Sequence, residues 1–132
     1  MAAFDRPVIK PRPVYLNLFA IRMPLPAIVS ILHRASGALL FLLGIPLVLY
    51  VVQRALQSPD AWAQMRSAFD APLAKITAVV LAWAFLHHLL AGIRHLLLDA
   101  HVGVDLPAAR RSSAVTLVLA VVITVAIAVR LW

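Results

Sequence analysis

The sequence predicts an all-α membrane protein whose three transmembrane helices form an antiparallel up-down bundle. Of the 132 residues, 64% are apolar and only 13% are charged. Soluble domains contain about 25% charged residues, so this chain has too little polar surface to cover a domain in water. It also contains three stretches without Lys, Arg, Asp or Glu, at residues 35–53, 76–93 and 112–129. Each is close to the roughly 20 helical residues that cross a hydrocarbon core of about 30 Å.

Each uncharged stretch predicts one helix, and we expect the three helices at about 27–52, 73–98 and 113–131. Pro24 and Pro26 hold the preceding chain extended, so the first helix should begin near Ala27. Residues 54–72 form a polar connection bounded by turn residues, with room for a short amphipathic turn. The third stretch is rich in Val and Ile, but a lone strand would leave its backbone groups unsatisfied in lipid.

Basic residues flank the expected helices unequally and predict the orientation. Seven belong to the N-terminal flank and the second connection: Arg6, Lys10, Arg12, Arg22, Arg94, Arg110 and Arg111. Four lie on the other side: Arg54, Arg66, Lys75 and Arg130. The positive-inside rule therefore places the N-terminus inside and the C-terminus outside. Anionic lipid headgroups and a soluble inner-side partner account for the net charge of +7, so no nucleic acid is implied.

The chain divides into two parts on these grounds. Residues 1–26 form a basic, proline-containing segment on the inner side, and residues 27–132 form a three-helix membrane anchor domain. The first segment has no apolar run long enough for a cleavable signal peptide. The chain has no cysteine, which excludes disulfide scaffolds and cysteine-based zinc sites.

Polar residues interrupt the first two expected helices at helical spacing. One face of the first helix carries Ser30, His33, Arg34 and Gly37. One face of the second carries His88, Gly92 and His95, whereas His87 is rotated about 100° away with Arg94. Antiparallel packing brings both faces together at the inner end of the bundle. The glycines would leave room for a flat ligand there, although small residues also serve plain helix packing.

Histidine and arginine inside a span are costly and usually face a functional site. A haem fits this pattern, because imidazole is an axial ligand of iron and cations or hydrogen-bond donors hold the propionates. A quinone would suit the donors Ser30 and Arg34. A proton path is the competing explanation, but the third helix offers few polar residues to continue it: Ser113, Thr116 and Thr124. Near the helix ends, extension of the side chain to the membrane surface is the alternative for Arg34 and Arg94.

The two motifs, taken together and in this order, resemble one family. Ser30-x-x-His-Arg-x-Ser-Gly37 followed by His88-x-x-x-Gly-x-Arg-His95-x-x-x-Asp99 is similar to the cytochrome b subunit of succinate dehydrogenase. The resemblance extends over the whole chain. That subunit is one of a pair of membrane anchors in respiratory complex II.

The resemblance implies a role for each motif residue. His88, rather than His87, would be the axial ligand of haem b, and His33 would lie close to a propionate. Ser30 and Arg34 would line the ubiquinone site. Arg94 and His95 would lie at the haem edge, with Asp99 either holding His95 through an i, i+4 contact or only pairing at the helix end.

The resemblance also implies a larger assembly. A second anchor subunit would supply the other haem ligand, a flavoprotein subunit would oxidise succinate, and an iron–sulfur subunit would carry electrons to ubiquinone. This chain would be the anchor, located in a bacterial or mitochondrial inner membrane. It would bind neither flavin nor an iron–sulfur cluster, since it has no Gly-rich nucleotide motif and no cysteine. The alternatives are an anchor of fumarate reductase using menaquinone, or a non-redox membrane scaffold or transporter subunit.

Overall fold

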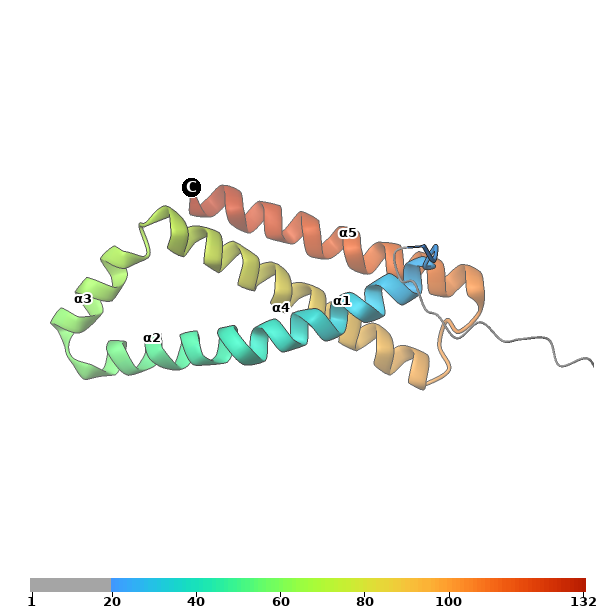
Figure 1. Ribbon diagram of the computed structural model, residues 1–132, viewed down its shortest axis with the longest axis horizontal. Helices are drawn as coiled ribbons and strands as arrows, with labels where there is room; N and C mark the ends of the chain where they lie inside the picture. The colour runs from blue at the N-terminus through green and yellow to red at the C-terminus, as the bar shows by residue number, and fades with distance from the viewer. Residues whose placement is uncertain (1–19) are drawn as a thin grey trace, which may run out of the picture.

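The computed structural model describes residues 20–132, and every element in that range is helical. In chain order the elements are α1 (Leu25–Leu39), the π-helical segment η1 (Leu40–Gly44), α2 (Ile45–Gln57), α3 (Pro59–Ala68), α4 (Pro72–Asp99) and α5 (Leu106–Leu131). Figure 1 shows the long helices running in alternating directions, so the up-down arrangement is confirmed. Of the expected N-terminal segment 1–26, residues 1–19 lie outside the described residues.

Three helices are long and apolar enough to cross a membrane: Leu25–Gln57, Pro72–Asp99 and Leu106–Leu131. The first consists of α1, η1 and α2 in continuous sequence. Helix α4 packs against both α1 and α5, and α1 also contacts α5. Near the N-terminal end of α4, the Lys75 ammonium lies 5.6 Å from the centre of the Trp132 ring and so connects α4 to the end of α5.

The predicted helix boundaries need two corrections. The third long helix begins at Leu106 rather than near residue 113, because Asp105 caps it by accepting a hydrogen bond from the Ala108 N–H at 3.2 Å. Its first turns carry Arg110 and Arg111, so a search for uncharged residues omits them. The first long helix likewise continues to Gln57 instead of residue 52.

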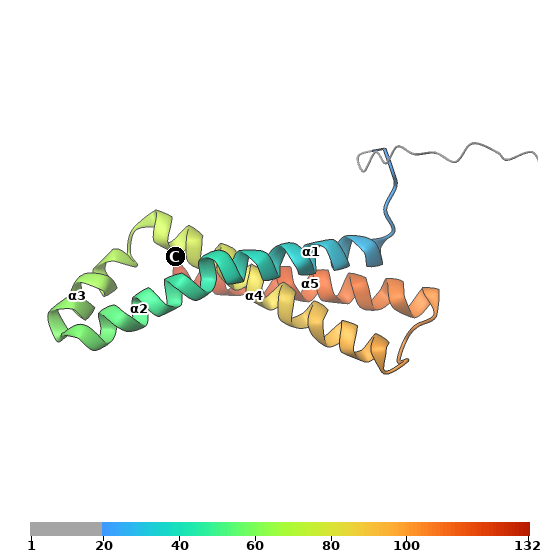
Figure 2. The same ribbon diagram turned by 60° about the horizontal axis from the view of Figure 1, so that its bottom comes forward.

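The polar connection 54–72 is also more ordered than a short turn. It holds the ten-residue helix α3, which projects beyond the N-terminal end of α4 and the C-terminal end of α5 (Figure 2). Ser58 begins this helix, since its hydroxyl accepts a hydrogen bond from the Ala61 N–H at 3.1 Å, and Pro59 occupies the first turn.

Small and polar residues, rather than large hydrophobic ones, fill the contacts between the helices. The buried residues of α4 are Ala84, His87, Ala91 and Arg94. Those of α5 are Ser113, Thr116, Ala120 and Thr124. Many large aliphatic side chains are exposed instead and would face lipid, whereas small residues let the helix backbones approach closely.

The hydroxyl groups of α5 mostly serve this packing. Ser113 donates to the Ala109 carbonyl at 2.7 Å, and Thr124 donates to the Ala120 carbonyl at 2.6 Å. Both bonds stay within α5, so these two side chains do not extend a polar path across the bundle.

Replacing Ala120 with leucine should separate α5 from its neighbours. Ala120 is fully buried, and overpacking of a close contact costs about 1–3 kcal/mol. We expect Ala120→Leu to lower the melting temperature of the detergent-solubilised protein. Ala126→Leu is the matched control, because Ala126 is exposed on the same helix and its added methyl groups would face lipid. Equal melting temperatures for the two variants would contradict the described packing.

Candidate functional site

Two glycines bring α1 and α4 together, and each lies beneath a histidine of the other helix. A Cβ atom on Gly37 would lie only 2.7 Å from Cε1 of His88. A Cβ atom on Gly92 would lie 3.5 Å from Nε2 of His33, an ordinary contact distance. The room that these glycines provide is therefore taken by two imidazole rings, and Gly37 in particular tolerates no side chain with His88 in this position.

The contact between α1 and the C-terminal half of α4 holds a cluster of three imidazoles, from His33, His88 and His95. The rings of His33 and His88 are stacked, with centroids 4.2 Å apart and planes inclined by 12°. The His95 ring lies 5.1 Å from that of His33 at an inclination of 53°. All three are half-buried. The structure thus brings together the three histidines that the two sequence motifs contributed.

The backbone of α1 orients the His88 ring. Nδ1 of His88 lies 3.0 Å from the carbonyl oxygen of His33. A carbonyl only accepts, so Nδ1 carries the proton and donates it, which leaves the lone pair of the neutral ring on Nε2. The Ser36 hydroxyl lies 3.5 Å from Nδ1 and donates to the same carbonyl at 3.0 Å. Histidines that bind a metal through one nitrogen commonly donate the other N–H in this way.

These histidines do not form a metal site by themselves. Among residues 20–132, no group of three or more His, Cys, Asp or Glu side chains is arranged to hold a metal ion. A haem needs less from this chain, because its macrocycle already binds the iron and the protein adds axial ligands. The half-buried His88, with its tautomer fixed and Nε2 available, fits that requirement.

The neighbouring His87 occupies a different environment. It is fully buried in the bundle, and its ring stacks on Trp83 with centroids 5.4 Å apart. Within the described part of the chain, neither ring nitrogen has a hydrogen-bond partner. A large ligand outside the bundle could reach His87 only if the helices separated.

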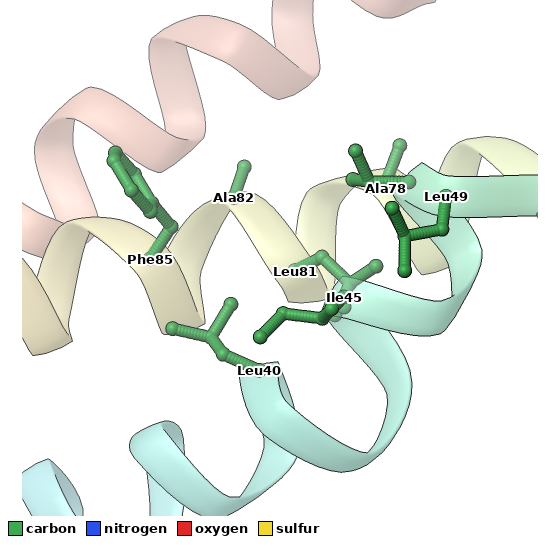
Figure 3. A pocket seen from close by; sticks show the side chains of 9 residues that line it. Leu40, Ile45, Leu49, Ala78, Leu81, Ala82 and Phe85 are labelled. Carbon is green, nitrogen blue, oxygen red and sulfur yellow. The ribbon is translucent and has the colours of Figure 1, made fainter. Parts of the chain in front are cut away.

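Side chains of the first long helix and of α4 line an apolar groove (Figure 3). It has a volume of about 520 Å³ and separates the first long helix from α4. The lining residues are Leu40, Gly44, Ile45, Val48, Leu49, Ala78, Leu81, Ala82 and Phe85. Because Leu40 and Phe85 are each about one helical turn from Gly37 and His88, the groove adjoins the cluster and offers it hydrocarbon surface.

Ser30 and Arg34 lie on the surface of α1, in its second and third turns. Arg34 is exposed and Ser30 is half-buried. Neither side chain forms a hydrogen bond or an ion pair with another described residue, so both donors are available to a ligand. Asp99 is exposed at the end of α4 and, within residues 20–132, makes no ion pair with His95.

Arg94 does not join the cluster, although it directly precedes His95 in the motif. Successive helical residues are rotated by about 100°, so its side chain points toward α5 instead of α1. Its Nε donates to the Ser112 hydroxyl at 3.0 Å, and one terminal nitrogen donates to the Ala109 carbonyl at 3.3 Å. The sequence did not predict this contact with α5. Its only sign in the sequence is that Arg94 and His88 fall on different faces of the helix.

An alanine at position 37 should disrupt the α1–α4 contact. The added methyl group would overlap the His88 ring, and such overpacking costs about 1–3 kcal/mol. We expect Gly37→Ala to lower the thermal stability of the solubilised protein. Gly44→Ala is the control, since its Cβ would meet the flexible Leu40 side chain at 3.3 Å and the Leu81 side chain at an ordinary 3.8 Å, and alanine favours a helix over glycine. A Gly37→Ala protein as stable as the Gly44→Ala protein would refute this packing.

Comparisons with known proteins agree with the resemblance of the two motifs. A family model described as succinate dehydrogenase/fumarate reductase transmembrane subunit matches residues 9–127. The chain is 37% identical over 114 residues to a succinate dehydrogenase cytochrome b556 subunit of Paracoccus denitrificans, covering 86% of this chain and 87% of that protein. It is 34% identical over 122 residues to the subunit of the same name from Coxiella burnetii, covering 92% and 97%. The chain belongs to the succinate dehydrogenase/fumarate reductase transmembrane subunit family.

Proposed function

We propose that the chain is the haem-holding membrane anchor of a succinate:ubiquinone oxidoreductase, serving the tricarboxylic acid cycle and electron transport. The observation that carries this proposal is the His88 ring, whose Nδ1–H bonds to the His33 carbonyl and whose Nε2 is left for an iron. The relatives are named cytochrome b556 subunits, and a cytochrome b contains haem b. Bound haem would supply a one-electron carrier inside the membrane.

His88 would provide one axial ligand, and a second anchor subunit would provide the other. The stacked ring of His33 lies against that of His88 with centroids 4.2 Å apart, which leaves no room for a group held between the two rings. His33 would therefore not supply the second ligand. We assign His33 and His95 to the surroundings of the haem. Arg34, a cation on the same face of α1 as His33, would bind a haem propionate or the quinone.

Ser30 and Arg34 would bind ubiquinone at the inner end of α1. A serine hydroxyl can donate to one quinone oxygen, and the planar guanidinium of arginine can donate to another. Ser30 lies in the second turn of α1 and Arg34 in the third, on the same face of the helix. An iron–sulfur subunit would dock on this side, and a flavoprotein subunit bound to it would oxidise succinate. The N-terminus would face the cytoplasm or matrix, and the C-terminus would lie outside the inner membrane.

Substitution of His88 should remove the haem signal. In the assembled complex, we expect His88→Ala to abolish or strongly shift the b-type absorption bands, because the iron loses an axial ligand. His87→Ala is the matched control and should keep the bands, since that ring faces the bundle interior. Spectra are normalised to intact complex, because an empty site is a packing defect that can reduce assembly. Unchanged bands in an assembled His88→Ala complex would exclude His88 as the ligand.

Substitution of Ser30 or Arg34 should separate quinone reduction from succinate oxidation. We expect Ser30→Ala and Arg34→Lys to lower quinone reductase activity about 30–150-fold, the effect of losing about 2–3 kcal/mol in the transition state. Succinate oxidation with an artificial dye and the haem content should stay near wild type. Parallel assays with ubiquinone and menaquinone report which quinone the complex uses. Near-normal quinone reduction in both variants would assign the pocket to the other subunits.

A further inference from the structure

Arg94 is a cation held inside the bundle by neutral groups. The side chain is only 6% exposed. Its hydrogen bonds go to the Ser112 hydroxyl and the Ala109 carbonyl of α5. Ser112 in turn donates to the Ala109 carbonyl at 3.2 Å, which completes a small network between the two helices.

No carboxylate neutralises this charge within residues 20–132. The acidic residues in that range are Asp60, Asp70, Asp99 and Asp105, and all four are exposed. None of them forms an ion pair with Arg94 in the described structure. Because water and ions screen buried charges much less than surface charges, the field of Arg94 extends further than that of an exposed arginine.

Arg94 lies on the same helix as the proposed haem ligand. Arg94 follows His88 by six positions on α4, which corresponds to about 9 Å along a helix axis. Inside a protein in a membrane, electrostatic interactions are stronger than in water.

We propose that Arg94 raises the reduction potential of the haem held at His88 through its buried charge. A haem held at His88 would gain one negative charge on reduction, and a fixed positive charge on the same helix would favour that change. Arg94 acts here without touching the haem, while its hydrogen bonds hold it in place against α5. This inference rests on the proposed haem-binding function.

The test compares two substitutions at Ser112 that differ only in charge. A carboxylate at this position would lie beside the Arg94 guanidinium and neutralise its field, whereas the amide of asparagine has a similar shape without a charge. The purified complex is titrated potentiometrically while the b-type absorption is recorded. We expect Ser112→Asp to lower the midpoint potential and Ser112→Asn to leave it unchanged.

Substitutions of arginine provide an independent comparison. Arg94→Gln should lower the midpoint potential. Arg94→Lys should leave it near the wild-type value, because the charge remains. Arg111→Gln removes an equal charge from the exposed surface of α5 and should have no effect.

The outcomes separate this inference from the haem assignment. Equal potentials for Ser112→Asp and Ser112→Asn, or a wild-type potential in Arg94→Gln, would show that Arg94 only joins the helices. An equal fall in Arg94→Lys and Arg94→Gln would also overturn the role of charge. Absence of a b-type spectrum in the wild-type complex would instead refute the proposed function. If one of the Ser112 variants does not assemble, the two Arg94 variants are sufficient for the test. The Ser112 pair is likewise sufficient if an Arg94 variant does not assemble.

Discussion

The hydrogen bond from His88 to the carbonyl oxygen of His33 is the interaction on which the site depends. It joins α4 to α1 and determines which nitrogen of His88 carries the proton. It also requires Gly37, because any side chain there would occupy the position of the His88 ring. The same contact therefore holds the two helices together and leaves Nε2 of His88 free to bind iron.

Helix α4 presents different chemistry to its two neighbours. Toward α1 it presents His88, Gly92 and His95, which form a half-buried cluster with His33. Toward α5 it presents small side chains and Arg94, whose guanidinium bonds to the first turns of α5. Because both faces belong to one continuous helix, the contacts of Arg94 with α5 lie at a fixed distance along α4 from the candidate haem site. That separation lets a residue that makes no contact with the cluster act on it electrostatically.

Periodicity predicted the parts of this architecture that follow from a single helix. The uncharged stretches identified all three spans, and helical spacing placed His88, Gly92 and His95 on one face and Arg94 on another. The register between helices was not predictable, since no local pattern shows that Gly37 lies beneath the ring of His88. For the same reason, the partner of Arg94 on α5 was missed. The start of α5 was misplaced because its capped first turns are polar, and α3 was expected only as a turn because its ten residues are mostly small or polar.

The central claim is that His88 binds haem iron through Nε2 while its Nδ1–H remains bonded to α1. The most direct measurement is a structure of the assembled membrane complex by electron cryomicroscopy, at a resolution that shows side chains and haem. The account predicts iron at Nε2 of His88, the His33 carbonyl still within hydrogen-bond distance of Nδ1, and a ligand from a second subunit on the opposite face. Iron bound to His87, or a haem site formed without this chain, would contradict it.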